Sequence, residues 1–147
     1  MQLLNDMKIT QLDHKDKDIT TKLDKAWRSV DLKHYGREID EWKVEEIFLY
    51  VGSKESPTGY LFANVQMGVC YISELVVVES QRGKGIGKLL MNRAEHIAIE
   101  KGAHNIYLTT GKNWDERKFY EKLGYQKTAD LKNHFLGEDF IHLTKTL

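Results

Sequence analysis

Apolar positions recur along this chain with the spacing of helices in three places. That spacing predicts helices over residues 18–32, 85–101 and 114–123. The apolar positions of the first are Ile19, Leu23, Ala26, Trp27 and Val30, and those of the second are Ile86, Leu90, Ala94 and Ile97. Gly102 and Gly124 follow the last two ranges, and a glycine just past the final turn commonly ends a helix.

Shorter apolar runs, rich in aromatic and β-branched residues, predict strands. We expect them at residues 8–12, 47–51, 60–65, 69–78, 105–110, 125–129 and 140–145. Residues 33–46 are polar, with Tyr35 and Trp42 interleaved, and we expect a loop and a short helix there. The order is then β-α-α-β-β-β-α-β-α-β-β, which predicts an α/β (α+β) fold in which a mixed sheet carries helices on both faces.

Length and charge narrow the class of protein. The chain has 147 residues, so a single domain over residues 1–147 is expected. Lys and Arg together number 22, as do Asp and Glu, which argues against a dedicated partner of nucleic acid or of a membrane surface. Cys70 is the single cysteine, and no Cys/His cluster has zinc spacing, so we expect no metal. We find no signal peptide and no long apolar stretch, and expect a cytoplasmic protein.

Residues 81–87 form a glycine-rich turn between a predicted strand and a predicted helix. Glycines allow close backbone approach, and a helix N-terminus presents free N–H groups, so this arrangement favours a phosphate site. A nucleotide P-loop is excluded because Leu89 stands where Ser or Thr would follow Gly87-Lys88. A dinucleotide fingerprint is excluded because Lys88 stands in place of its third glycine.

What remains is Arg82-x-x-Gly85-x-Gly87, which resembles the acyl-CoA pyrophosphate loop of the GNAT superfamily of N-acetyltransferases. Residues 113–125 resemble the second signature of that family, including its Phe-Tyr pair at Phe119 and Tyr120. Glu116 departs from the pattern, because the family usually has a small Ala there. The resemblance implies the GNAT fold and acetyl-CoA as cosubstrate.

The resemblance also implies how acetyl-CoA is held. Backbone N–H groups of the loop bind the pyrophosphate, the strand around Glu74–Val78 bulges and splays from its neighbour, and a free N–H near Val76 faces the thioester carbonyl. The residues expected to bind acetyl-CoA are Leu75, Val76, Val77, Val78, Arg82, Gly83, Lys84, Gly85, Ile86, Gly87, Lys88, Asn113 and Tyr120. Lys84 and Lys88 could equally be solvated surface lysines, and Asn113 could instead cap the helix that follows it.

Two catalytic residues are expected. Tyr120 matches the family's usual general acid, and a phenol with a pKa near 10 keeps its proton at neutral pH and can donate it to a departing thiolate. Glu74 is the candidate general base, acting directly or through water, because a primary amine is almost entirely protonated at neutral pH. Glu79 is the weaker candidate for the base.

The acceptor is expected to be the primary amine of a small molecule. In the family, the segments at residues 31–46 and 132–139 wall the acceptor pocket, and the first holds six acids against three bases. Tyr35, Trp42 and Glu74 are the expected substrate-binding residues. The alternatives are a protein N-terminal or lysine acetyltransferase, and a non-catalytic module that binds acyl-CoA. Homodimer formation and use of a longer acyl-CoA are left open.

Overall fold

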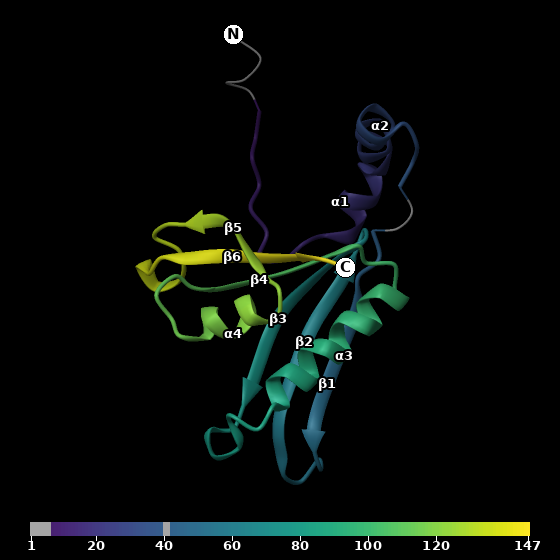
Figure 1. Ribbon diagram of the computed structural model, residues 1–147. Coiled ribbons are helices and arrows are strands. Elements are labelled where there is room, and N and C mark those ends of the chain that lie inside the picture. The colour runs from purple at the N-terminus through teal and green to yellow at the C-terminus, as the bar shows by residue number, and fades with distance from the viewer. Residues whose placement is uncertain (1–6, 40–41) are drawn as a thin grey trace. The chain divides into compact units, whose positions relative to one another are not determined.

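The chain divides near residue 40 into two compact units, shown in the computed structural model of Figure 1. The structure describes residues 7–39 of the first unit and residues 42–147 of the second. Each unit is treated by itself below. The expectation of a single domain over residues 1–147 stays a prediction.

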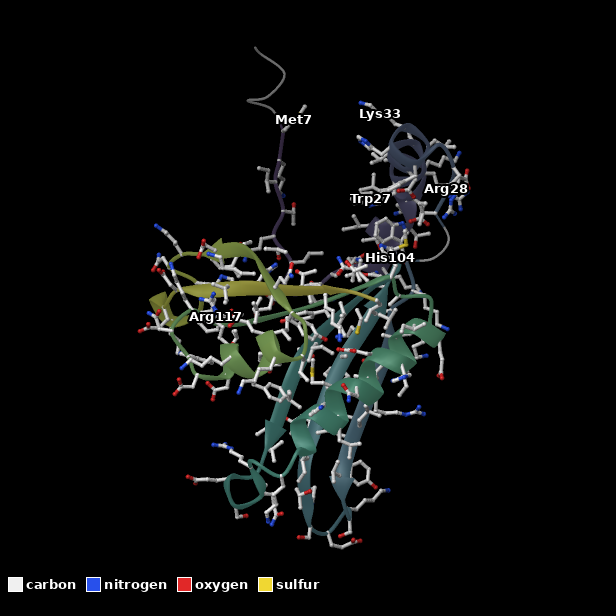
Figure 2. The ribbon with its side chains drawn as sticks, in the orientation of Figure 1. Met7, Trp27, Arg28, Lys33, His104 and Arg117 are labelled. Carbon is white, nitrogen blue, oxygen red and sulfur yellow. The ribbon has the colours of Figure 1, made fainter. Side chains whose placement is uncertain are left out.

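The first unit contains two helices where the spacing predicts one over residues 18–32. They are α1, Lys17–Lys22, and α2, Asp24–Tyr35. The Asp16 side chain accepts a hydrogen bond from the Ile19 N–H at 2.9 Å and so caps α1. The break falls at Leu23, which closes one helix and opens the next. Trp27 projects from α2 and is 66% exposed (Figure 2). The spacing of apolar residues therefore predicted the apolar face of this helix, but it did not predict whether that face is buried.

Two elements expected near the N-terminus are wrong. Residues 8–12 form no strand, and Ile9 is 95% exposed. A run this short becomes a strand only when a neighbour pairs with its backbone. No short helix follows α2 among the described residues 36–39 and 42–44. Residues 40 and 41 of that expected segment lie outside the described residues, as do residues 1–6.

The second unit is built on a mixed six-stranded sheet. Its strands are β1 Glu45–Gly52, β2 Pro57–Gln66, β3 Val69–Val77, β4 Asn105–Gly111, β5 Gln126–Leu131 and β6 Phe140–Thr146. Their order across the sheet is β1-β2-β3-β4-β6-β5, and the pairing of β3 with β4 is the parallel one (Figure 1). Six of the seven expected strands are therefore confirmed, within a residue or a few of the expected ends.

Helix α3, Ile86–Glu100, packs on β1, β2 and β3, and helix α4, Glu116–Lys122, packs on β4. The buried residues of α3 are Leu90, Met91, Ala94 and Ala98. Leu90 and Ala94 were expected there, whereas the expected Ile86 and Ile97 are only partly buried. The alternating residues Leu61, Ala63 and Val65 of β2 are buried, and so is Cys70 of β3.

A partly buried polar cluster ties α3 to the C-terminal part of the sheet. Glu95 of α3 has a side chain 13% exposed and accepts bonds from Lys145 of β6 at 2.8 and 3.0 Å. The Tyr125 hydroxyl donates to the same carboxylate at 3.0 Å. Tyr125 itself is buried just after α4. These bonds fix the segment that carries α4 against α3.

The sheet opens where β3 and β4 part. Their parallel pairing covers only Val69–Tyr71 against Asn105–Tyr107. On the other side of β3, Phe62 faces Glu74 and Ala63 faces Ile72, so Ser73 is an extra residue and forms a β-bulge. The expected bulge and splay are thus confirmed, with the bulge one residue before Glu74. After Tyr71, the edge of β3 that faces β4 is unpaired, while the other edge stays paired with β2.

Candidate active site

A cavity of about 550 Å³ lies between the free edge of β3, the N-terminus of α3 and helix α4. Its lining residues are Leu75, Val76, Val77, Gln81, Arg82, Gly83, Gly85, Ile86, Gly87, Lys88, Glu116, Phe119, Tyr120, Lys122 and Leu123. The ionisable side chains among them are three bases, Arg82, Lys88 and Lys122, and one acid, Glu116, apart from the phenol of Tyr120. A cavity with a basic excess at a helix N-terminus suits a phosphate group.

The loop before α3 is shaped by two glycines in the left-handed region, Gly83 with φ +76° and Gly85 with φ +86°. They turn the chain so that α3 begins with its N–H groups at the cavity. The Arg82 Nε donates to the Val77 carbonyl at 3.0 Å, which fastens the loop to β3. A Cβ on Gly87 would lie 3.1 Å from the Phe119 ring, so glycine there lets α3 approach α4 closely.

The free edge of β3 presents backbone donors to this cavity. The Val78 N–H donates to the carbonyl of Thr58 in β2 at 2.9 Å, so the backbone N–H of Val78 points toward β2. The backbone N–H groups of successive residues in a strand point to opposite edges. The Val76 N–H therefore also points toward β2, while the N–H groups of Leu75 and Val77 point to the open edge. The free N–H expected near Val76 therefore belongs to Leu75 or Val77, one residue to either side.

A second cavity, of about 400 Å³, lies on the far side of Tyr120. Its lining residues are Tyr60, Ile72, Ser73, Glu74, Leu75, Val76, Leu108, Thr109, Thr110, Trp114, Glu116 and Tyr120. Four of these, Leu75, Val76, Glu116 and Tyr120, also line the first cavity. The carboxylates here are Glu74 and Glu116, and no Lys or Arg of the described chain lines this space. The two cavities meet, and their charges differ in sign.

Glu74 lies on β3 just after the bulge and is exposed. Its Oε2 accepts a hydrogen bond from the Tyr60 hydroxyl of β2 at 2.6 Å. That bond and the negative charge of Glu74 raise the pKa of Tyr60 above its ordinary value. Tyr60 thus remains a donor, and it holds the carboxylate at the second cavity. No sequence pattern indicated Tyr60, because the bulge decides that Tyr60, the diagonal neighbour of Glu74 on β2, lies on the same face of the sheet as Glu74.

Tyr120 lies in the last turn of α4 and lines both cavities. Burial, and then the negative charge of Glu116, raise the pKa of Tyr120 to about 12. Its ring meets the Phe119 ring at 5.0 Å, and its carbonyl accepts the Tyr125 N–H at 3.1 Å. The phenol is therefore fixed and protonated where the two cavities join.

Trp114 forms one wall of the second cavity, a role that the sequence did not single out. It lies over Gly111, where a Cβ would be 2.3 Å from the indole. The ring centroids of Trp114 and Phe140 are 5.2 Å apart, and those of Phe140 and Phe135 are 5.1 Å apart, both in an edge-on arrangement. The loop between β5 and β6, expected to wall the acceptor pocket, thus supports that wall through an aromatic cluster.

Ten of the residues expected to bind acetyl-CoA line the first cavity, while Val78, Lys84 and Asn113 do not. The cap proposed for Asn113 is wrong, because α4 begins at Glu116 after Asp115 and has no side-chain cap. Lys84 instead donates to Gln81 at 3.0 Å. Glu79 opens a short 3₁₀ turn and lines neither cavity.

The other two expected substrate-binding residues, Tyr35 and Trp42, have different outcomes. Tyr35 ends α2 in the first unit, so its assignment stays a prediction. The Trp42 carbonyl accepts the Gln66 side chain at 2.7 Å, at the end of β2 opposite Tyr60. Trp42 does not line the second cavity, and the geometry gives its assignment no support.

None of the helices described in residues 7–39 and 42–147 is both long and apolar enough to cross a bilayer. Within the same part of the chain, His, Cys, Asp and Glu form no group of three or more that could hold a metal ion.

Comparison with known proteins agrees with the geometry. The sequence profile of the Acetyltransferase (GNAT) family matches residues 17–125, which is more than half of the chain. The protein Acetyltransferase Atu2258 of Agrobacterium fabrum is 33% identical over 90 residues. That match covers 61% of this chain and 65% of the relative, so the chain spans just under two thirds of that relative's length.

Solved structures show the same fold. A crystal structure of an acetyltransferase from Bacillus cereus superposes with a TM-score of 0.69 at 25% identity, over 94% of this chain and 98% of that one. A GNAT family acetyltransferase from Elizabethkingia anophelis, solved with acetyl-CoA bound, has a TM-score of 0.63 at 21% identity. It matches 68% of this chain and 75% of its own length.

Proposed function

The chain belongs to the GNAT acetyltransferase family, and from this premise we propose that it transfers an acetyl group from acetyl-CoA to the primary amine of a small molecule. The observation that carries the proposal is the meeting of two cavities of opposite charge at Tyr120. The basic one suits a pyrophosphate and the acidic one suits an amine. Acetyl-CoA bound to the Elizabethkingia relative supports the choice of donor.

The residues of the first cavity are assigned to the donor. The N–H groups at the start of α3, with Arg82 and Lys88, bind the pyrophosphate. Leu75 and Val77 offer the backbone groups of the β3 edge to the pantetheine arm. One of their N–H groups then lies beside the thioester carbonyl and stabilises the charge that develops on its oxygen. Losing such a donor typically costs about 10²–10³ in rate.

The residues of the second cavity are assigned to the acceptor. Glu74, held by Tyr60, takes the proton from the ammonium form of the acceptor, directly or through water. The free amine then attacks the thioester carbonyl, the C–N bond forms and the C–S bond breaks. Tyr120 donates a hydrogen bond to the sulfur as it gains negative charge. Acetyl-CoA supplies the activated acetyl group. The nitrogen loses one more proton as the amide forms, this proton passes through water to the thiolate, and free CoA and an amide are the products.

The test is an acetyl-transfer assay across a panel of acceptors. The purified protein, acetyl-CoA and each acceptor are mixed, and free thiol is measured as it is released. The panel contains small alkylamines, amino acids, a peptide with a free N-terminus and a peptide with an internal lysine. We expect the small amines to give the highest kcat/KM. Transfer only to the peptides would replace the acceptor class, and thiol release with none would leave a module that binds acyl-CoA.

A further inference from the structure

Glu116 is a carboxylate that the proposed reaction does not use. It lies in the first turn of α4, is exposed, and lines both cavities where they meet. The other acids of the α4 segment are paired, since Arg117 (labelled in Figure 2) contacts Glu121 at 2.7 Å and Lys118 contacts Asp115 at 3.4 Å. Among the described residues, Glu116 has no ion-pair partner.

Left alone, this carboxylate opposes acetyl transfer. Its negative charge helps to raise the pKa of Tyr120, which makes the phenol a weaker acid. The departing sulfur also gains negative charge beside Tyr120, and like charges at short range repel. A positive group beside Glu116 would remove both penalties. The side chains that line the second cavity supply none, and the bases of the first cavity, Arg82, Lys88 and Lys122, form no ion pair with Glu116.

We propose that Glu116 is a specificity-determining residue, which selects an acceptor amine that carries a second positively charged group. This inference rests on the proposed function and names the substrate class: an α,ω-diamine or a longer polyamine. One amine is deprotonated by Glu74 and reacts, while the other stays an ammonium ion and pairs with Glu116. The acceptor itself then neutralises the charge that would otherwise hinder departure of the thiolate.

The walls of the second cavity fit such a molecule. Tyr60 and Trp114 offer aromatic surface for the methylene chain, and an ammonium over an aromatic face gains further attraction. The two carboxylates come from different elements, β3 and α4, so the cavity can contact both ends of one acceptor. Monoamines satisfy only one of them.

The experiment compares three acceptors of equal chain length: diaminobutane, butylamine and aminobutanol, whose hydroxyl is neutral. Each is assayed by thiol release with the wild type, Glu116→Ala and Glu121→Ala. Glu121 is the matched control, because it is an exposed acid on the same helix that lines neither cavity. For the wild type, we expect kcat/KM for diaminobutane to exceed that for aminobutanol by about tenfold, the worth of one charge-assisted hydrogen bond.

Glu116→Ala should abolish the preference for diaminobutane. Its kcat/KM should fall about tenfold for diaminobutane. For the two monocations it should hold or rise, because the repelling charge is gone. Glu121→Ala should keep the wild-type order. A loss of similar size on all three acceptors with Glu116→Ala would mean that Glu116 is structural, and equal wild-type rates on all three would overturn the selection.

Binding gives a readout that needs no turnover. Calorimetry should show that the wild type binds diaminobutane more tightly than butylamine, and that added salt weakens the difference, as it does for any charge pair open to solvent. Glu116→Ala should lose the difference. Diamine binding without transfer to any amine would refute the proposed reaction and keep the charge selection, whereas transfer to monoamines alone would do the reverse.

Discussion

Replacing Tyr120 by Phe should lower kcat and leave the KM for acetyl-CoA almost unchanged. The change removes only the hydroxyl, and the ring keeps its contacts with Phe119 and Tyr125. The hydroxyl interacts with the sulfur only as charge develops there, so its loss is felt in the transition state rather than in binding.

The pKa of Tyr120 sets the size of this effect. A phenol with a pKa of about 12 is a weaker acid than a thiol, whose pKa is about 8.5 in a cysteine side chain. Full proton transfer to the thiolate is therefore uphill, by about 1.4 kcal/mol for each unit of pKa difference. What Tyr120 can supply is a hydrogen bond to a charged acceptor, worth about 1.5–3 kcal/mol. We accordingly expect a loss in kcat of about 10- to 100-fold, at or below the lower limit of about 10² that is typical of acid catalysis.

The assay is thiol release over a range of acetyl-CoA concentrations at saturating acceptor. Tyr50→Phe is the matched control, because it deletes an exposed hydroxyl of β1 that lines neither cavity. Because the pKa of Tyr120 is raised, the phenol keeps its proton up to about pH 11, and the wild-type rate should show no alkaline decline from it below that pH. A loss below about threefold, or one confined to KM, would refute this role of Tyr120.

Two further changes test the base and the scaffold. Glu74→Gln should reduce kcat/KM most at low pH, where the free amine is scarcest, and a uniform offset across the pH profile would make Glu74 structural. Glu95→Ala should lower the free energy of unfolding by about 3 kcal/mol, because it leaves the Lys145 ammonium and the buried Tyr125 hydroxyl without their shared acceptor. Chemical denaturation measures this, and a change below about 1 kcal/mol would mean that water replaces the carboxylate at no cost.

The parts of the site that could be predicted are those built from neighbours in sequence. The turn at Gly83 and Gly85 and the start of α3 follow from a local pattern, and the structure has them where that pattern places them. The position of Tyr120 on α4 follows in the same way.

What could not be predicted depends on contacts between distant segments. The bulge at Ser73 decides that Tyr60 holds Glu74 and that Leu75 and Val77, rather than Val76, face the open edge. Strand register is a property of two strands, and one strand's residues do not reveal it. The strand predicted at residues 8–12 is absent for a related reason, since the backbone of these residues has no strand partner.

The central claim is that acetyl-CoA binds at the N-terminus of α3, and calorimetric titration of acetyl-CoA tests it most directly. Gly85→Asp places a carboxylate at the turn that should face the pyrophosphate. Gly102→Asp is the matched control at the other end of α3, since both glycines have φ above +80° and open space where a Cβ would lie. We predict that Gly85→Asp weakens binding at least about tenfold through charge repulsion, while Gly102→Asp binds like the wild type. Equal affinity for all three proteins would contradict the assignment of this loop.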